Sequence, residues 1–420
     1  MHMGKNYTKC YKWILLALVS STYFLAQGTR QIYNTVLPQI KADFAAAGAC
    51  LTDTDFGLVS SAFTLVFGIV MPLGGFFADF FSRKWMIVIG TVLFSIGIFM
   101  SGFAAGLGLL LVAYGTVNAT GQALMPPSNS SLIGQFHVKT RATAFSIYQI
   151  VFYVGIVVCS CVSGWLSGLG EGGWRKAFLL FGAIGVAWSF LLAFVMRDTP
   201  QPKAADGAEE KASLKEALVA FVGKPSALLL MLGVGTYLYA KYAYNTWIID
   251  YLQRDPLLMS KEAAAFHGVF WFYLCATIGV FAAGRFSDRF AAKNGKVRFD
   301  VNIAGLLLFI PGLLLTAYAP NAALCVAGTG VLGFASGVYD SNFYASLFEV
   351  VKPRYRAAAV GVFGFGGAVI GAIGPVMLGW MSAHFSMSAG IASLSYIALF
   401  GAAAIFVART FFFARDKVSS

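Results

Sequence analysis

The fold of this chain is decided by residues 75–84, Gly-Phe-Phe-Ala-Asp-Phe-Phe-Ser-Arg-Lys, which lie between two long apolar segments. A second version, Gly-Arg-Phe-Ser-Asp-Arg-Phe-Ala-Ala-Lys, occupies residues 284–293, and its acid, Asp288, follows Asp79 by 209 positions. Two more pairs recur in the same order: Ser131-Leu132 with Ser346-Leu347, 215 positions apart, and Tyr33-Asn34-Thr35 with Tyr244-Asn245-Thr246, 211 positions apart. Three ordered matches at nearly one spacing indicate an internal duplication, so we expect two related halves.

The composition predicts that both halves lie in a membrane. The 420 residues are 58% hydrophobic and 11% charged, with a mean hydropathy of +0.74, whereas a soluble domain has about 25% charged residues. Apolar stretches of about 20 residues, long enough to cross a ~30 Å hydrocarbon core, recur along the chain. They include Trp13–Tyr33, Phe56–Ala78, Trp85–Gly106, Ala177–Val195 and Ile303–Ala319. Period-2 alternation is absent, which does not support a lipid-facing β-barrel.

We therefore expect an all-α integral membrane protein with twelve transmembrane helices in two pseudo-symmetric six-helix bundles. The bundles are predicted at residues 1–196 and 227–420. Residues 197–226 are polar and carry mixed charge, which indicates a cytoplasmic linker with a short amphipathic helix. Repeats of this kind are typical of secondary transporters, in which one half rocks against the other around a central site.

The basic residues report the orientation of the chain. With the N-terminus inside, the predicted cytoplasmic segments hold 23 Lys and Arg residues and the opposite side holds five. This positive-inside bias predicts a multi-pass protein of a bacterial-type inner membrane with both termini in the cytoplasm. It also explains the net charge of +12 without a nucleic-acid partner. Two cations, Arg30 and Lys241, fall inside predicted helices instead.

Ionisable residues inside a membrane span are costly and mark functional sites. The Tyr-Asn-Thr match aligns Arg30 with Lys241, which predicts one cation from each half facing a shared axis as a clamp for an anion. Snorkelling to the headgroups and pairing with a structural acid are the alternatives. Lys241 lies roughly 14 residues, or ~20 Å, into its helix, too deep to snorkel easily to the cytoplasmic side. Asp340 is the conspicuous acid; we expect it to couple protons to substrate occupancy, with a structural ion pair as the alternative.

Uncharged polar residues surround these charges at helical spacing. They have the donors and acceptors that bind sugar hydroxyls, although hydrogen bonds between helices are an equally good explanation for any one of them. The candidate substrate-binding residues beside Arg30 and Lys241 are Gln27, Tyr33, Asn34, Asn118, Gln122, Gln149, Tyr153, Tyr237, Tyr244, Asn245 and Asn342.

The chain resembles the major facilitator superfamily over essentially its whole length. Residues 75–84 are similar to the superfamily's Gly-x-x-x-Asp-x-x-x-Arg-Lys signature, but lack a Gly before the Arg, and residues 284–293 are a fainter copy. From their position at helix ends we expect Asp79, Arg83, Lys84 and Asp288 to act in gating, by pairing in one conformation and separating in the other. Anchoring at the headgroups is the alternative.

Two branches of that superfamily are similar in further detail. Arg30 with Pro38 resembles an arrangement in the anion:cation symporters, which take up sugar acids with protons, and in the organophosphate:phosphate antiporters. The run Gly173-Trp174-Arg175-Lys176-Ala177-Phe178 resembles the symporter branch, whereas Gly121-Gln122-Ala123 replaces that branch's usual Gly-Glu-Ala. The missing acid moves the expected coupling site to Asp340. One Arg and one Lys, rather than two Arg, favour a carboxylate over a phosphate.

We therefore expect uptake of an acidic sugar, such as sialic acid, a hexuronate or an aldonate, by alternating access with proton symport. An organophosphate:phosphate antiporter and a drug or lipid exporter are the alternatives, and sodium coupling and exchange stay open. No acid-base, nucleophile or metal-ligand constellation indicates an enzyme, and we expect no cofactor and no metal site. The expected partners are a small organic anion, the coupling ion and the lipid bilayer, with the protein as a monomer.

Overall fold

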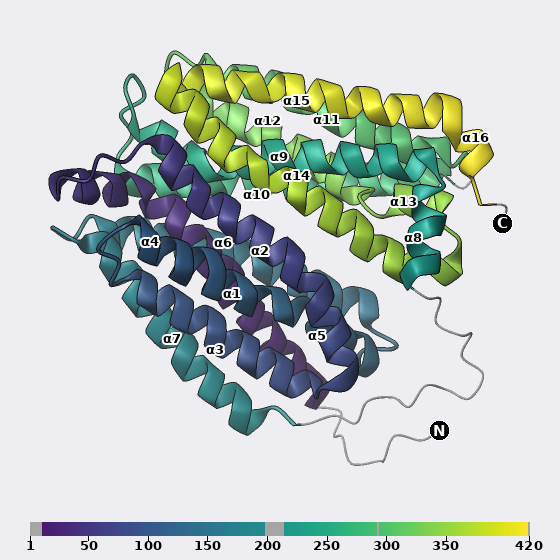
Figure 1. The fold of residues 1–420 in the computed structure, drawn as a ribbon, viewed down its shortest axis with the longest axis horizontal. Helices are drawn as coiled ribbons and strands as arrows, with labels where there is room; N and C mark the ends of the chain where they lie inside the picture. The colour runs from purple at the N-terminus through teal and green to yellow at the C-terminus, as the bar shows by residue number, and fades with distance from the viewer. Residues whose placement is uncertain (1–10, 198–213, 292–293, 419–420) are drawn as a thin grey trace. The chain divides into compact units, whose positions relative to one another are not determined.

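The structure, a computed structural model, describes residues 11–197, 214–291 and 294–418, and its regular elements there are all helical. Helices are what the sequence demands, because a backbone in hydrocarbon must satisfy its N–H and C=O groups within its own segment. The elements run through the chain as Figure 1 labels them.

Twelve long helical segments make up the described part of the chain. In order they are α1 (Tyr11–Ala46), α2 (Asp53–Phe80), α3 (Arg83–Ser101), α4–η1–α5 (Leu107–Leu110, Leu111–Asn118, Ala119–Phe136), α6 (Arg141–Ser167), α7 (Gly173–Val195), α9 (Pro225–Gln253), α10 (Lys261–Ala291), α11 (Lys296–Ala317), α12–α13 (Ala322–Ser341, Ala345–Val350), α14 (Arg356–His384) and α15–η3–α16 (Met387–Val407, Ala408–Phe412, Phe413–Asp416). Two short elements complete the set: α8 (Leu214–Val222) and the 3₁₀ turn η2 (Pro353–Tyr355).

Ten of the twelve are apolar enough, by length and composition, to cross a membrane. The other two are α1, with 36 residues, and α9, with 29. These two helices do not reach the hydropathy of a candidate span, because each carries several polar residues and a cation in its interior, Arg30 in α1 and Lys241 in α9. The two long helices outside this set are thus the pair that the repeat aligns, and most of their residues are buried within the protein.

The contacts divide the chain into two compact units. Unit 1 contains Met1–Leu51, Val66–Lys203 and Lys261–Phe266, and unit 2 contains Thr52–Leu65, Ala204–Ser260 and His267–Ser420. The beginning of α2 therefore belongs to unit 2, and the first turns of α10 belong to unit 1.

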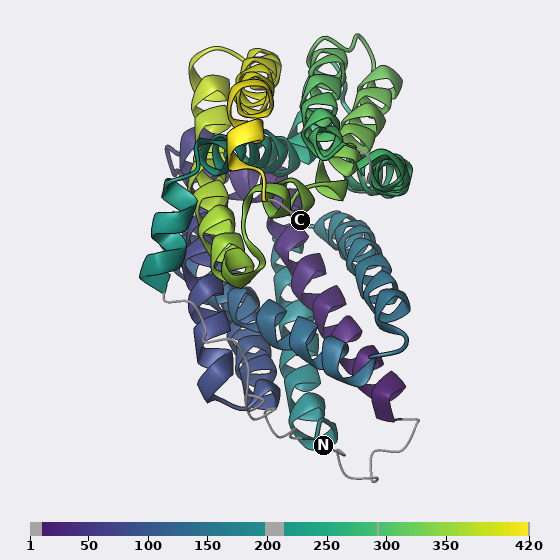
Figure 2. The same cartoon turned by 90° about the vertical axis from the view of Figure 1, so that its right-hand side faces the viewer.

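The same helix pairings occur in both units. In unit 1, α1 packs against α6, α3 against α7, and α3 against η1 and α5. In unit 2, α9 packs against α14, α11 against α15, and α11 against α12. If the six long helices of each half are numbered in chain order, both units pair the first helix with the fifth, the third with the sixth, and the third with the fourth. Figure 2 shows α15 (yellow) beside α14 (yellow-green) within unit 2.

Glycines bring the first pair of each unit into close contact. A Cβ at Gly28 of α1 would come within 2.3 Å of the Cys159 sulfur on α6, and a Cβ at Gly374 of α14 within 2.3 Å of the Tyr239 carbonyl oxygen on α9. Small residues allow this approach where packing alone holds helices together. The two cation-bearing helices are therefore each fixed against a partner through a glycine.

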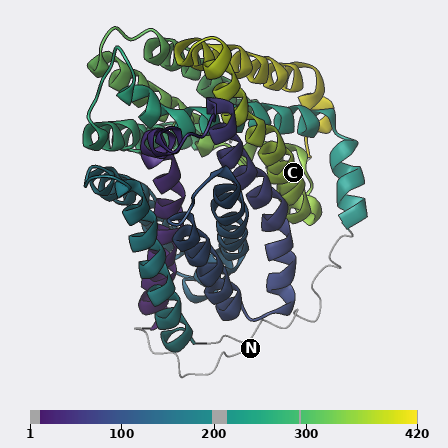
Figure 3. The same cartoon turned by 60° about the vertical axis from the view of Figure 1, so that its left-hand side comes forward.

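The segment expected to link the halves is described only in part. Residues 198–213 lie outside the described residues, and α8 begins at Leu214. This short helix lies beside the beginning of α9 and beside α14, and appears in teal in Figure 3.

Candidate functional site

Lys241 and Asp340 form an ion pair inside unit 2. The Lys241 ammonium donates to Asp340 Oδ2 at 2.8 Å and to the Tyr237 hydroxyl at 2.9 Å. Helix α9 brings Tyr237 and Lys241 to one face because they are four residues apart, and α12 supplies the acid. The side chains are 17% and 30% exposed, so a ligand or a proton can reach both.

Tyr237 contacts both charged groups of the ion pair through its hydroxyl. Its ring is fully buried and stacks on Tyr339 with centroids 4.1 Å apart. Its hydroxyl donates to Asp340 Oδ1 at 2.7 Å and lies 2.6 Å from Ser336 Oγ. Because one residue contacts both members of the ion pair, loss of the Tyr237 hydroxyl removes support from Lys241 and Asp340 together. The sequence predicted Tyr237, Lys241 and Asp340; it missed Ser336, one turn before Asp340, which the i, i+4 rule offers as a neighbour.

Helix α12 ends directly after Asp340. Its last residue is Ser341, Asn342 caps it, and α13 begins at Ala345. Asn342 is buried; its side chain accepts from Ser287 at 2.7 Å and donates to Ser341 at 3.0 Å. Breaks of this kind within a span are typical of binding sites in transporters.

Arg30 occupies the corresponding place in α1 of unit 1. Its backbone carbonyl accepts a hydrogen bond from the Tyr114 hydroxyl at 2.6 Å, and its guanidinium lies 5.6 Å from the centre of the Phe67 ring. Tyr33 is fully buried and stacks on Tyr114 at 4.9 Å. The aromatic residues Tyr114 and Phe67 were not among the predicted site residues, since only the fold brings η1 and α2 to this part of α1.

Asn118 and Gln122 form a buried amide pair beside the π-helical turn η1. Gln122 Nε2 donates to Asn118 Oδ1 at 2.9 Å, and both side chains are at most 1% exposed. Within the described residues, Asn118 Nδ2 and Gln122 Oε1 have no further hydrogen-bond partner. Irregular π turns are often found at functional sites. The pair therefore has one donor, Asn118 Nδ2, and one acceptor, Gln122 Oε1, and leaving a buried polar group without a hydrogen bond costs free energy.

The other predicted binding residues differ in exposure. Gln27 and Asn34 are buried on α1, and Asn34 Nδ2 lies 3.4 Å from Gln31 Oε1. Tyr244 is buried and hydrogen-bonds Thr329 at 2.7 Å. Tyr153 and Asn245 are half-buried, and Gln149 is exposed. Among the predicted residues, Lys241, Asp340 and Tyr237 are in direct contact, and Asn118 contacts Gln122.

The predicted gating residues lie at helix ends. Arg83 and Lys84 begin α3 and are half-buried, with the Lys84 ammonium 5.2 Å from the Trp85 ring centre. Asp288 is exposed on α10. Asp79 is part of α2, but its side chain lies outside what the structure describes. A gating role for these residues stays a prediction.

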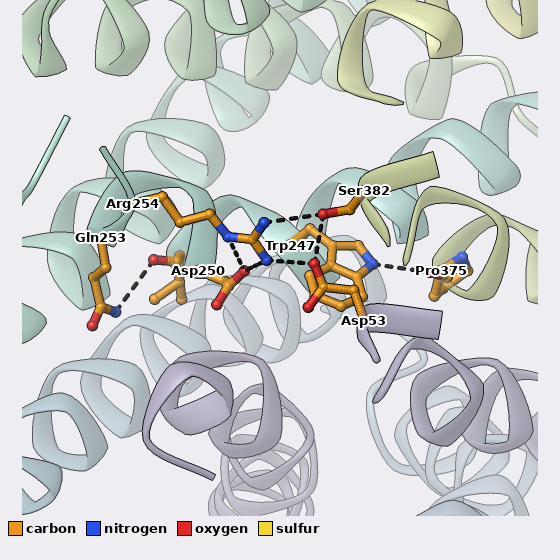
Figure 4. A network of polar contacts seen from close by, with 8 residues as sticks. Asp53, Trp247, Asp250, Gln253, Arg254, Pro375 and Ser382 are labelled. Atoms are coloured by element: carbon orange, nitrogen blue, oxygen red, sulfur yellow. Dashed lines mark hydrogen bonds and ion pairs between the residues drawn. The ribbon is translucent and has the colours of Figure 1, made fainter. Parts of the chain in front are cut away.

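A second charged cluster, missed by the sequence analysis, follows the end of α9 (Figure 4). Arg254 donates to Asp250 Oδ2 at 2.8 Å, to Asp53 Oδ2 at 2.7 Å and to Ser382 Oγ at 3.0 Å. Asp53 begins α2, so this cluster joins the start of α2 to α9 and α14 within unit 2. From the sequence Arg254 counted only as a loop charge; the signal available was Asp250, one helical turn before it.

The sequence matches the Major Facilitator Superfamily over residues 19–297 and 230–420. The chain belongs to this superfamily. As a member it is a multi-pass membrane transporter and not an enzyme, and the expected twelve-helix fold is confirmed.

The relatives found by sequence are distant but span nearly the whole chain. A "Probable sulfoacetate transporter SauU" of Cupriavidus necator is 24% identical and covers 88% of this chain and 86% of its own. An "MFS-type efflux pump" of Mycolicibacterium smegmatis is 24% identical over 87% and 85%, and a "D-galactonate transporter" of Escherichia coli is 22% identical over 93% and 94%. Among solved structures, a bacterial homologue of the human lysosomal transporter Spinster, inward-facing and unoccupied, is similar with a TM-score of 0.85 at 22% identity, over 99% of this chain and 100% of that one.

Proposed function

We propose that this transporter takes up an organic anion, and specifically an acidic sugar, together with a proton across a bacterial-type inner membrane. The observation that carries the proposal is the ion pair of Lys241 and Asp340, shared with Tyr237, on two helices of unit 2. The names of two relatives, for sulfoacetate and D-galactonate, support an anionic substrate. Sialic acid, hexuronates and aldonates are the classes to test.

The ion pair suggests how substrate and proton exchange places. A charge pair in a low-dielectric interior is stable only while both charges are present, since removing one partner leaves the other uncompensated. When Asp340 takes up a proton, Lys241 loses its counter-ion and becomes a site for a substrate carboxylate. When the substrate leaves, Asp340 releases its proton and restores the pair. Substrate and proton therefore bind together and leave together, which couples their transport in the same direction.

Lys241 also has hydrogen-bonding capacity to spare. An ammonium has three donors, and among the described residues Lys241 uses two, on Tyr237 and Asp340. The third can bind a substrate oxygen in addition to the donor that protonation of Asp340 releases. We propose that Asn118 and Gln122, with one donor and one acceptor available, bind hydroxyls of the substrate or a water that contacts it.

Arg30 is proposed as the second cation of the site. The support is the repeat that aligns it with Lys241 and the aromatic residues that hold it in unit 1. A planar guanidinium binds a carboxylate with two parallel hydrogen bonds.

Ligand-induced thermal stabilisation of the purified chain tests the binding site. A ligand raises apparent stability by RT ln(1 + [L]/Kd), so millimolar binders register at high concentration. The panel contains galactonate, glucuronate, sialic acid, sulfoacetate, glycerol 3-phosphate and a neutral hexose. We expect a carboxylate to raise the melting temperature of the wild type and of Lys176→Ala, which removes an exposed cation elsewhere, but not of Arg30→Ala or Lys241→Ala. A response of both site variants equal to that of the wild type would remove them from the site.

The efflux pump among the relatives supports an exporter as the second candidate. A drug exporter would need a large apolar cavity, and the 39 Phe residues allow one. Accumulation of ethidium in cells separates the two functions: expression of an exporter lowers it, whereas expression of a sugar-acid importer leaves it unchanged. Glycerol 3-phosphate stabilising the protein better than every carboxylate would favour the organophosphate antiporter instead.

A further inference from the structure

Five cations surround a pocket in unit 2 that is separate from the Lys241–Asp340 pair. The pocket has a volume of about 570 Å³. It is formed by the residue before α9, the loop between α13 and α14, and the end of α16. Its charged residues are Lys224, Lys352, Arg354, Arg415, Lys417 and one acid, Asp416.

Lys224 ties the three segments together. Its ammonium donates to the carbonyl oxygen of Val350, the last residue of α13, and to that of Asp416, the last residue of α16, at 2.8 Å. A cation at the C-terminal end of a helix satisfies carbonyl groups that have no partner within the helix. This arrangement fixes the ends of three membrane helices at one level.

The single acid of the pocket does not neutralise the cations. The Asp416 side chain is 3% exposed, and its Oδ2 accepts from the backbone N–H of Ser226 at 2.9 Å while Oδ1 lies 3.3 Å from Arg415. Arg354 has Glu216 at 3.7 Å, but both side chains are about half exposed, where such a pair contributes little. Burial lowers the pKa of Lys224, Asp416 counteracts this, and the neighbouring Lys352 lowers that pKa further. Lys352 and Lys417 remain exposed around the opening.

Position and charge together identify a ligand. The candidate spans Ala322–Val350 and Met387–Asp416 end at this pocket, and α9 starts there. Span ends lie where the hydrocarbon gives way to the headgroups, and basic pockets between membrane helices on the cytoplasmic side suit anionic lipid headgroups. We propose that the pocket binds a phosphate group, and that this phosphate belongs to an anionic phospholipid. The site is independent of the transported substrate.

Native mass spectrometry of the full chain with defined lipids tests this site. The probes are phosphatidylglycerol, phosphatidylcholine and soluble glycerol 3-phosphate, titrated onto the delipidated protein. The pocket variant carries Lys352→Gln and Lys417→Gln, which are exposed substitutions that leave Lys224 in place. The control carries Arg285→Gln and Arg289→Gln, two exposed cations on α10, for an equal loss of charge.

We expect one phosphatidylglycerol to bind the wild type and the control alike, and the pocket variant to bind it about 30-fold more weakly, since each cation at such a surface adds roughly a factor of five. Phosphatidylcholine should bind weakly to all three. Equal phosphatidylglycerol binding by the pocket variant and the control would overturn the site. Glycerol 3-phosphate binding as tightly as the lipid, and weakened only in the pocket variant, would overturn its assignment to a lipid.

Discussion

Helix α9 carries two charged clusters that are built differently. At its middle, Lys241 has one carboxylate partner, Asp340, and the two charges cancel. Following its end, Arg254 has two, Asp53 and Asp250, plus the hydroxyl of Ser382. The clusters are 13 positions apart, or about 20 Å along a helix. One cluster is balanced and the other has a carboxylate in excess.

This difference indicates in which cluster a single proton can change the net charge. A single proton on Asp340 removes the one carboxylate that Lys241 contacts among the described residues, and turns a neutral pair into a net positive site. Arg254 keeps one carboxylate when the other is lost, and its planar fork holds several acceptors at once. We therefore expect the Lys241 pair to switch and the Arg254 cluster to hold the start of α2 in place.

The largest effect should come from Arg254→Gln. This substitution leaves Asp53 and Asp250, whose side chains are 13% and 4% exposed, without their cation. Breaking a buried charge cluster in this way costs about 3–5 kcal/mol, which we expect as a large fall in the melting temperature of the purified protein. Arg254→Lys should recover only part of the loss, because an ammonium is a point charge. A melting temperature within a degree of the wild type would show that the cluster contributes nothing to stability.

Lys241→Met should destabilise the protein less, by about 2–3 kcal/mol, because Asp340 is 30% exposed and water screens its charge. The double variant Lys241→Met, Asp340→Leu should recover most of that stability, since it removes both charges. Thermal melting of the two single variants and the double variant measures the coupling. Additive losses in the double variant would mean that the two side chains do not stabilise each other.

Asp340→Asn sharpens the comparison at the level of transport. An asparagine resembles the protonated acid, so Lys241 stays available to the substrate while proton exchange is lost. We expect accumulation of substrate in proteoliposomes driven by a pH gradient to fall at least tenfold, with counterflow of substrate retained. Glu171→Gln, at an exposed acid in the turn before α7, is the matched loss of an acid and should keep accumulation closer to the wild type. Normal accumulation by Asp340→Asn would assign coupling elsewhere.

The smallest effect should come from Ser382→Ala. The hydroxyl makes one hydrogen bond with Arg254 and one with Asp53, while the two carboxylates of the cluster remain. Loss of such a hydroxyl costs about 1 kcal/mol, so the melting temperature should fall by a small but measurable amount. A loss as large as that of Arg254→Gln would mean that Ser382, and not the guanidinium, organises the cluster.

The repeat could be predicted from the sequence because its signals are local. The Asp79 and Asp288 stretches, the positive-inside bias and the apolar runs depend on residues near one another in the chain or on composition. The same helix pairings in both units agree with that duplication. The stretch Trp13–Tyr33 was expected as an ordinary apolar span. Helix α1 is nevertheless one of the two long helices that are not apolar enough to count as a candidate span, because Gln27, Arg30, Gln31 and Asn34 interrupt its apolar residues.

The sequence by itself determined the fold class, the twelve helices and the choice of Arg30, Lys241 and Asp340 as charges that need an explanation. A charge in a membrane span is conspicuous in one dimension because lipid offers it no solvation. Only the tertiary structure decided which charges meet: Asp340 is 99 positions from Lys241, and Asp53 is 201 positions from Arg254. It also decided that Lys224, Lys352 and Arg415 surround one pocket. Ion pairs form over a few ångströms, and only packing brings residues this far apart in the chain to that distance.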